Sequence, residues 1–297
     1  YIPLTQDLGG IVLRPGVSCT IRLSDLDSLT FAQLIDAVLP TEFQRAIALT
    51  AFRLYKRKAK STLKEPDLDL FMRCIEEAGS ELSARRESLE NVIARVGSLL
   101  GGMQRIIGQG VDWQKLLRLK GVVDIDCRGL PELDLQLLLA GILSDLYKSR
   151  VDRRIPPFVL SFDEAHIFIP RYRQTPSSEL IKRLLRFGRH YGICLIMITQ
   201  FPDSVDPEAI RLPATRFVFA IEPSQLMEAR SILADLPSDL VSQLYKLEAG
   251  LCVLAGTRET IRHATMIRIR SDRKTRHGGQ TPNILEELRR WRGGQTS

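Results

Sequence analysis

The pattern of hydrophobic and polar positions changes twice along the chain. Residues 11–23 form a short strand-like stretch. From residue 29 to residue 100 the apolar positions recur at helical spacing, with interruptions at Pro40, Pro66 and Gly79. An apolar stripe that repeats every three or four residues is typical of amphipathic helices, and Pro and Gly interrupt them. The pattern therefore predicts four helices in this part of the chain.

After residue 110, short apolar runs alternate with amphipathic segments. Strands are predicted at 122–125, 158–162, 193–199, 217–221, 251–255 and 265–269. Helices are predicted at 133–147 and 178–191, and near 225–233 and 239–247. This alternation indicates an α/β fold with a mainly parallel sheet covered on both faces, into which the all-helical stretch is inserted. Ligands of such sheets bind at the carboxyl ends of the strands.

The composition excludes several other classes of protein. With 297 residues, of which 44% are hydrophobic and 26% are charged, the chain has enough material for about two domains and is not disordered. Its longest strongly apolar run, residues 193–199, is far shorter than a membrane span, so no membrane partner is expected. The five cysteines are widely spaced and form no Cys-x-x-Cys pair, which indicates buried thiols in a reducing compartment and a cytoplasmic location.

The net charge of +7 is concentrated near the end of the chain. Between Arg258 and Arg292 there are ten basic and four acidic residues, which is a local surplus of six positive charges. Binding of a polyanion such as DNA is expected to concentrate there. Within this stretch, residues 284–291 have the pattern of an amphipathic helix that packs on protein rather than on a membrane.

Two adjacent carboxylates, Asp163 and Glu164, follow the predicted strand at 158–162. Four of the five residues of that strand are hydrophobic, so we expect it to be buried on both faces. Charges at the tip of a buried strand are costly unless they serve chemistry. In a nucleotide-hydrolysing sheet the first carboxylate holds Mg²⁺, usually through water, and the second orients or deprotonates the attacking water. The alternative is a pair that only caps the following segment.

The strand predicted at 193–199 also ends in polar residues. Thr199 and Gln200 stand at its tip, 36 residues beyond the acidic pair. If the two strands are neighbours, these side chains reach the same edge of the sheet as the carboxylates. Thr199 is then a candidate for nucleotide binding. The Gln200 amide can donate a hydrogen bond to a γ-phosphate or its attacking water, which predicts a catalytic sensor of nucleotide state.

A basic helix is predicted between these two strands. Arg183 and Arg186 are three residues apart and share one helix face, whereas Arg189 falls at the exit of the helix and can point outward. An outward guanidinium could reach the γ-phosphate held by a neighbouring subunit and act as a catalytic finger. The alternative is an ordinary basic surface helix.

The order of these motifs resembles the HerA family of the HerA/FtsK group. The resemblance covers about residues 122–270. It includes the acidic strand, the arginine helix that ends Gly-Arg-His-Tyr-Gly, the strand that ends Thr-Gln-Phe-Pro, and the segments that begin at Thr215 and Leu247. The helical stretch 29–100 is similar to the insertion that this family carries between its two nucleotide motifs.

The resemblance implies a RecA-like core, ATP and Mg²⁺ as cofactors, and a hexameric ring that threads double-stranded DNA and often partners a nuclease such as NurA. By motif match, Asp163 and Glu164 would be the Walker B pair, with Mg²⁺ held by Asp163. Arg189 would be the finger that acts on the neighbouring subunit, and Gln200 the sensor. The expected function is that of an ATP-driven DNA translocase or helicase.

One motif of that family is missing from the sequence. A phosphate-binding loop has the pattern Gly-x-x-x-x-Gly-Lys-[Ser/Thr], because only glycines let successive N–H groups close around phosphate oxygens. Lys60-Ser61-Thr62 has the end of this motif without its glycines. In the family the loop precedes the helical insertion, so we expect it upstream of Tyr1.

These observations predict an organisation in four parts. Residues 1–28 are expected to be a strand-rich segment that continues from an upstream part of the core. Residues 29–110 are expected to form a helical subdomain, and residues 111–275 the Walker B half of a RecA-like ATPase core. Residues 276–297 are expected to form a basic C-terminal helix or tail.

Other interpretations remain open. The letters Asp-Glu-Ala-His at 163–166 also occur in RNA and DNA unwinding enzymes, but that class expects a Ser-Ala-Thr-like motif after the next strand and a second lobe downstream. A ring-forming scaffold without hydrolysis would keep the acidic pair as a vestige, and a VirB4-like secretion or conjugation motor would share the ATPase chemistry. His166 could be a metal ligand, but no second His or Cys lies at ligand spacing.

Overall fold

The structure is a computed structural model that describes residues 2–61, 67–118, 122–225, 233, 236–257 and 261–270. Its helices are α1 (Ile2–Asp7), α2 (Ser28–Asp36), α3 (Glu42–Ala59), α4 (Leu68–Glu81), α5 (Arg86–Gly102), α6 (Trp113–Leu116), α7 (Glu132–Val151), α8 (Ala165–Phe168), α9 (Ser178–Phe187), α10 (Pro207–Arg211) and α12 (Ser238–Gln243). Its strands are β1 (Ile11–Leu13), β2 (Val123–Ile125), β3 (Phe158–Phe162), β4 (Ile193–Met197), β5 (Thr215–Val218), β6 (Leu251–Gly256) and β7 (Thr265–Arg268). Short 3-10 turns are η1 (Leu23–Asp25), η2 (Gly188–Tyr191), η3 (Pro202–Ser204) and η4 (Leu244–Lys246).

The four helices predicted between residues 29 and 100 are confirmed as α2 to α5. Three of them begin after a polar residue whose side-chain oxygen caps the first turn. Asp27, Thr41 and Asp67 accept hydrogen bonds of 2.7, 3.3 and 2.9 Å from the backbone N–H three residues later. Such caps satisfy N–H groups that have no partner inside the helix. Local sequence therefore sets where these helices begin.

The helical layer, defined as α2 to α5, packs around four aromatic rings. Phe31, Phe52, Tyr55 and Phe71 are completely buried. The rings of Phe31 and Phe52 are stacked with centroids 4.1 Å apart, and Phe71 meets Phe31 and Tyr55 edge to face at 5.7 and 5.4 Å. Both arrangements are favourable for aromatic rings, and large rings bury more apolar surface than any other side chains. A dense aromatic core therefore stabilises this layer.

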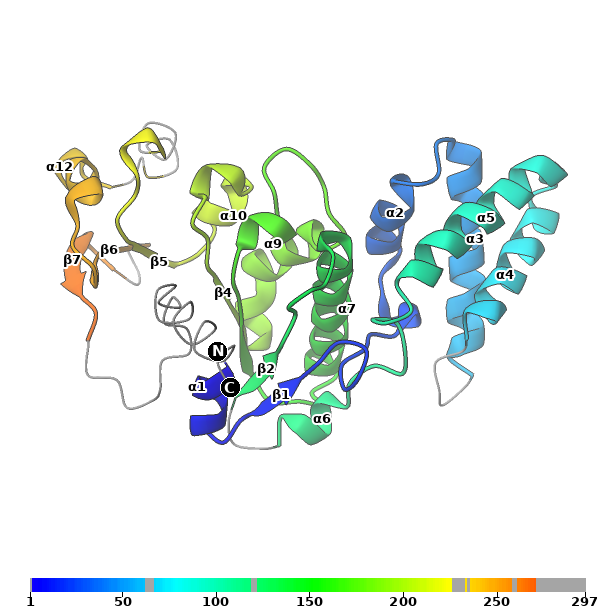
Figure 1. Ribbon diagram of the computed structural model, residues 1–297, viewed down its shortest axis with the longest axis horizontal. Helices are drawn as coiled ribbons and strands as arrows, with labels where there is room; N and C mark the ends of the chain where they lie inside the picture. Colours follow the sequence, from blue (N-terminus) through cyan, green and yellow to red (C-terminus); the bar gives the residue numbers. More distant parts are fainter. Residues whose placement is uncertain are drawn as a thin grey trace, which may run out of the picture.

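Helix α7 connects the helical layer to the strands. Twelve of its twenty residues are buried. Leu138 and Ile142 belong to the same hydrophobic core as the helical layer, whereas Leu139 and Leu143 belong to the core beneath β3 and β4. Figure 1 shows α7 between the helical layer and α9. The helical layer and the α/β part are thus joined through α7.

The seven strands within the described residues form three groups. β1 pairs with β2, and β3 pairs with β4, both in parallel. β5, β6 and β7 form an antiparallel sheet. The α/β class is therefore confirmed. The prediction was of a mainly parallel sheet, and the last three strands depart from it because they are antiparallel. The connection from β6 to β7, residues 257–264, is too short for the crossover that a parallel pair needs.

The two faces of the β3–β4 pair differ. The face with Leu160 and Leu195 packs against a core that includes residues of α7 and α9. On the other face, Val159 exposes 63% of its surface, and Ile196 and Ile198 expose 48% and 43%. The prediction that β3 is buried on both faces is therefore wrong for the described chain. Hydrophobic content alone does not reveal which face other segments cover.

Other predicted elements differ at their ends. The first segment holds helix α1 and one three-residue strand, so it is not strand-rich. The helix predicted at 178–191 ends at Phe187 and continues as turn η2, which closes with Gly192 at a φ of +69°. This left-handed conformation favours glycine. The basic tail 276–297, most of the helix near 225–233 and much of the basic stretch after Arg258 lie outside the described residues.

Among the described residues, no helix combines the length and the apolar character that crossing a membrane requires.

Candidate functional site

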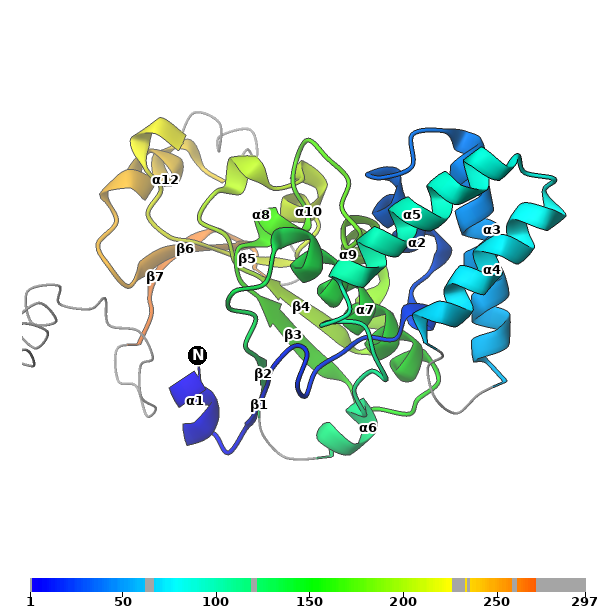
Figure 2. The same ribbon diagram turned by 45° about the vertical axis from the view of Figure 1, so that its right-hand side comes forward.

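The chain segments that follow β3 and β4 remain side by side beyond the ends of the strands. Ile198 N donates to Phe162 O at 3.1 Å, and Ala165 N donates to Ile198 O at 2.9 Å. Figure 2 shows β3 and β4 next to each other. The register pairs Phe162 with Met197, so the two strands end at the same level. The structure therefore brings the acidic pair and the Thr199-Gln200 pair to one edge, as predicted.

Glu164 has an unusual backbone conformation. Its φ and ψ are +52° and +51°, which lie in the left-handed region, and it is one of three non-glycine residues with positive φ in the described chain. Its N–H donates to Asp163 Oδ1 at 2.9 Å. For a residue with a Cβ atom this conformation costs about 1 to 2 kcal/mol. Such strained residues cluster at functional sites, because the surrounding structure must hold them in place.

The Glu164 carboxylate lies between two side chains and is hydrogen-bonded to one of them. Gln200 Nε2 donates to Glu164 Oε1 at 3.3 Å, and His166 Nδ1 lies 3.4 Å from Glu164 Oε2. The His166 ring meets Phe201 edge to face, with centroids 5.4 Å apart. The sequence predicted Glu164 and Gln200 as site residues but did not predict that His166 and Phe201 lie beside them. The available signal was that His166 closely follows the acidic pair and Phe201 directly follows Gln200 in the sequence.

The other two residues predicted at this edge have different surroundings. Asp163 is exposed, so its carboxylate can be approached from solvent. Thr199 Oγ1 accepts a hydrogen bond from Phe201 N at 3.1 Å, which shapes the turn after β4. An exposed carboxylate oxygen at the end of a parallel strand is a suitable donor for Mg²⁺, which binds few protein carboxylates and keeps several waters. Among the described residues, no group of three or more His, Cys, Asp or Glu side chains is placed to hold a metal ion.

Arg189 lies at the opposite end of the β3–β4 pair. It is an exposed residue of turn η2, which leads into the first residue of β4, whereas the acidic pair follows the last residue of β3. Five-residue strands separate these ends by ~16 Å at ~3.3 Å per residue. The structure therefore does not bring Arg189 to the acidic pair of its own chain.

The three arginines of this region have different surroundings. Arg183 donates to Tyr147 Oη at 3.2 Å and its guanidinium lies over the same ring, 4.9 Å from the centroid. Arg186 forms an ion pair with Glu208 of α10. Within the described part of the chain the Arg189 side chain makes no hydrogen bond or ion pair, and its backbone carbonyl accepts one hydrogen bond from Gly192 N. Arg183 and Arg186 thus tie α9 to its neighbours, and Arg189 alone remains available to a second molecule.

Two charged clusters near the strands were not predicted. Lys182 on α9 exposes only 10% of its side chain and pairs with Glu179 at 2.8 Å and with Asp206 at 3.3 Å. After β2, Arg128 donates two hydrogen bonds of 2.7 Å to Asp126, and this pairing lowers the pKa of that carboxyl to about 2. The Asp-Cys-Arg sequence directly after a short strand was the only signal of the second cluster.

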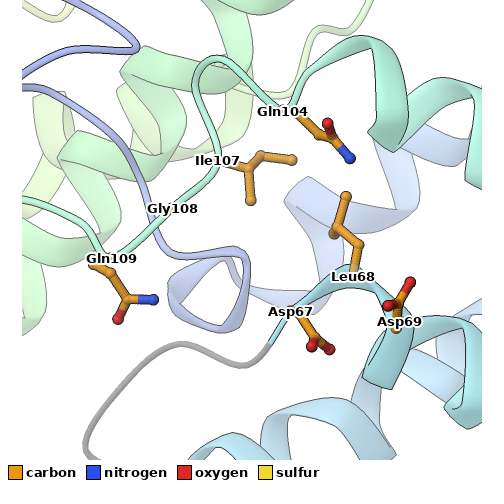
Figure 3. A pocket seen from close by; sticks show the side chains of 7 residues that line it. All are labelled: Asp67, Leu68, Asp69, Gln104, Ile107, Gly108 and Gln109. Carbon is orange, nitrogen blue, oxygen red and sulfur yellow. The ribbon is translucent and has the colours of Figure 1, made fainter.

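A pocket of about 340 Å³ lies elsewhere in the molecule, where α4 begins beside the loop that follows α5. Figure 3 shows its lining residues, which are Asp67, Leu68, Asp69, Gln104, Ile107, Gly108 and Gln109. Asp67 already caps α4. None of the residues predicted for the functional site lines this pocket.

Known proteins are similar to this chain over most of its length, although no family model matches it. The DNA double-strand break repair helicase HerA of Sulfurisphaera tokodaii is 23% identical over an alignment of 280 residues, which covers 88% of this chain and 56% of that protein. The protein of the same name from Pyrococcus furiosus is 23% identical over 98% of this chain and 62% of its own length. The chain thus spans little more than half the length of these curated relatives.

The fold is also found in a solved structure. VirB4 of Thermoanaerobacter pseudethanolicus matches with a TM-score of 0.69 at 13% identity, over 91% of this chain and 79% of that one. At this identity the match concerns the fold alone, and it confirms a RecA-like α/β core with attached helices. Together with the curated relatives, it confirms the resemblance of this chain to the HerA family of the HerA/FtsK group.

Proposed function

We propose that the full-length protein is an ATP-driven translocase or helicase motor of the HerA type that acts on double-stranded DNA. The observation that carries this proposal is the contact between Gln200 and a strained Glu164 at the shared carboxyl end of β3 and β4. A carboxylate and an amide held together at this edge are suited to orient a water molecule for attack on a phosphoryl group. The names of the curated relatives add support for DNA as the substrate.

Each residue at this edge has a separate role in the proposal. Asp163 would hold Mg²⁺, through water, and the bound ion would supply positive charge beside the phosphates of ATP. Glu164 orients the attacking water or accepts its proton, and its left-handed backbone fixes the direction of the carboxylate. Gln200 senses the γ-phosphate by exchanging its hydrogen bond to Glu164 for one to the nucleotide. Thr199 contributes to nucleotide binding beside it.

The phosphate-binding loop is proposed to come from a segment upstream of Tyr1. The printed sequence lacks the glycine pattern that would close around the phosphates. The curated relatives are longer than this chain, which leaves room in a full-length protein for such a segment. Asp163, Glu164 and Gln200 then complete a nucleotide site whose first half is supplied there.

We also propose that the motor is a ring, most simply a hexamer, in which Arg189 acts on the nucleotide of the neighbouring subunit. This role is compatible with the exposure of Arg189 and its distance from the acidic pair of its own chain. A guanidinium that stabilises the transferred phosphoryl group contributes about 10³ to 10⁵ in rate. A nuclease such as NurA, or another effector, is the proposed partner of the ring.

The experiment that tests this function is Glu164→Gln in the full-length protein. The substitution keeps the size and hydrogen-bonding ability of the side chain but removes its charge. We expect ATP to bind as before and hydrolysis to fall by about 10² to 10⁴, the usual contribution of a positioned base. Glu81→Gln, the same change at an exposed position of α4, is the control and should hydrolyse ATP like the wild type. Unchanged hydrolysis in Glu164→Gln would remove the proposed chemistry and favour a ring scaffold.

A further inference from the structure

The connection between α8 and α9 exposes an aromatic ring between two arginines. Tyr172 exposes 86% of its surface, the largest fraction among the large hydrophobic residues that the structure describes. Arg171 and Arg173 on either side are exposed as well. A tyrosine ring combines a flat apolar face with a polar edge, so an exposed one between basic residues is suited to contact another molecule.

Both ends of this connection are anchored. Pro170 forms an antiparallel bridge with Val205, and Arg171 N donates to Ser204 O at 3.0 Å. At the other end Thr175 is 2% exposed, and its N–H donates to Ser178 Oγ at 3.1 Å. The exposed tip, residues 171–174, is therefore presented by fixed ends, which lowers the entropy that a partner must remove on binding.

The charged groups at the tip have different contacts. Arg173 pairs with Glu132 at the start of α7, so much of its charge is already balanced. The Arg171 guanidinium lies 5.2 Å from the centre of the Tyr172 ring and makes one long hydrogen bond of 3.4 Å to Asp203 O. Arg171 thus keeps most of its five N–H donors, and Tyr172 offers a flat apolar face beside them.

We propose that this loop is a contact for the phosphodiester backbone of DNA. The Arg171 guanidinium pairs with a phosphate, because its planar fork matches phosphate oxygens. The Tyr172 ring packs against the adjacent sugar or an unpaired base, as aromatic rings do on single strands. A basic residue beside a flat aromatic ring suits a polynucleotide better than it suits an acidic peptide, which offers no flat face for Tyr172.

The anchoring links this contact to the proposed nucleotide site. The Arg171 backbone N–H donates a hydrogen bond to the carbonyl of Ser204, which lies four residues after Gln200. The Gln200 side chain in turn donates a hydrogen bond to Glu164. Gln200 and the residue that anchors the DNA-contacting loop thus belong to one short segment after β4. This inference rests on the proposed function for its substrate, but its test does not depend on hydrolysis.

The test is DNA binding by the full-length protein and by Tyr172→Ala and Arg171→Ala. Fluorescence anisotropy is measured with a labelled duplex and with a single strand of equal length, at salt from about 50 to 200 mM. We expect each substitution to weaken binding by about tenfold. Arg171→Ala should also reduce the slope of log affinity against log salt by about one, since one phosphate contact is lost.

Tyr245→Ala is the matched control, because Tyr245 is also exposed, by 44%, beside a basic residue, with the Lys246 ammonium 5.1 Å from its ring centre. It should bind DNA like the wild type. A larger loss on the single strand identifies a base as the partner of Tyr172, and equal losses identify the sugar-phosphate backbone. Wild-type affinity in both loop variants, or no DNA binding by the wild type, overturns the inference. Absence of ATP hydrolysis in the wild type counts against the proposed function only.

Discussion

The helical layer and the carboxyl ends of β3 and β4 are built in opposite ways. In the helical layer, four aromatic rings are completely buried and capped helices surround them. At the strand ends, Asp163 is exposed and Glu164 is held in a left-handed conformation. Natural proteins keep strained and exposed polar groups where chemistry needs them and recover stability elsewhere. The comparison therefore assigns stability to the helical layer and chemistry to the strand ends.

The largest expected effect concerns Arg189, at the other end of the strands from the acidic pair. In the full-length protein Arg189→Ala should reduce ATP hydrolysis by about 10³ to 10⁵, because the transferred phosphoryl group loses its cationic partner. The midpoint of thermal unfolding should not change, since the Arg189 side chain is exposed and makes no ion pair or hydrogen bond among the described residues. Steady-state ATPase assays and thermal denaturation measure the two quantities.

The control for Arg189 is Arg86→Ala in the helical layer. Arg86 is also exposed, and within the described ranges its one ion pair is with Glu90, one turn away on the same helix. Neither the rate of ATP hydrolysis nor the stability should change by more than a small amount.

A mixing experiment tests whether Arg189 acts on the neighbouring subunit. When Arg189→Ala subunits are mixed with wild type, each variant subunit should inactivate its ring, so that ATPase activity falls faster than the wild-type fraction. Activity strictly proportional to that fraction would contradict a finger that acts on the neighbour.

The second effect is on stability. Phe52→Ala removes a ring that is stacked on Phe31 in the centre of the helical layer, and it should lower the free energy of unfolding by about 3 to 5 kcal/mol. ATP hydrolysis per folded molecule should stay the same if the helical layer serves stability alone. Denaturant unfolding measures the loss. Phe43→Ala on the same helix is the control, because Phe43 is 44% exposed and should cost much less.

The sequence predicted most of the helical layer because the relevant signal is local. Spacing of three and four residues places Phe31, Phe52 and Phe71 on inward faces, and the caps precede the first turns directly. The acidic pair and Gln200 are 36 residues apart, yet their proximity could be predicted, since the carboxyl ends of neighbouring parallel strands meet at one edge.

Other features of the strand region could not be predicted from residue spacing or strand order. The contacts of Glu164 with His166, and of His166 with Phe201, depend on how two turns fold after the strands end. Whether one face of β3 and β4 is exposed depends on which segments lie over it. An apolar strand has the same sequence pattern whether one face or both are covered, so the pattern cannot predict this exposure. The antiparallel sheet depends on connection length, a weaker signal than periodicity.

A third prediction tests whether stability is confined to the helical layer. Lys182 is buried on α9, between Glu179 and Asp206. Burial by itself lowers the pKa of Lys182, but hydrogen bonds to these two carboxylates outweigh it, so the pKa is raised above 10.5. Lys182→Met should lower the free energy of unfolding by about 1.5 to 3 kcal/mol, because two carboxylates lose their cation. Lys115→Met, at an exposed position, is the control.

The pH dependence of the Lys182 effect follows from the direction of the pKa shift. A lysine whose pKa is higher in the folded state contributes its full stability below the pKa of the unfolded chain, and that contribution is lost as the pH rises through the folded value. The difference between wild type and Lys182→Met should therefore be constant from about pH 7 to 9 and should shrink above about pH 10.5. A difference that grows with pH would show that the ion pairs are not its source.

The smallest effect isolates the strain at Glu164. Glycine tolerates a φ of +52°, whereas alanine does not, so Glu164→Gly should be more stable than Glu164→Ala by about 1 kcal/mol. Both variants lack the carboxylate, which removes its contacts with Gln200 and His166 from the comparison. At Arg53, an exposed position within α3, the order should reverse, with alanine more stable than glycine by a similar amount because helices disfavour glycine. Equal stability of the two Glu164 variants in denaturant unfolding would mean that the strand end stores no strain, and the contrast with the helical layer would then rest on exposure alone.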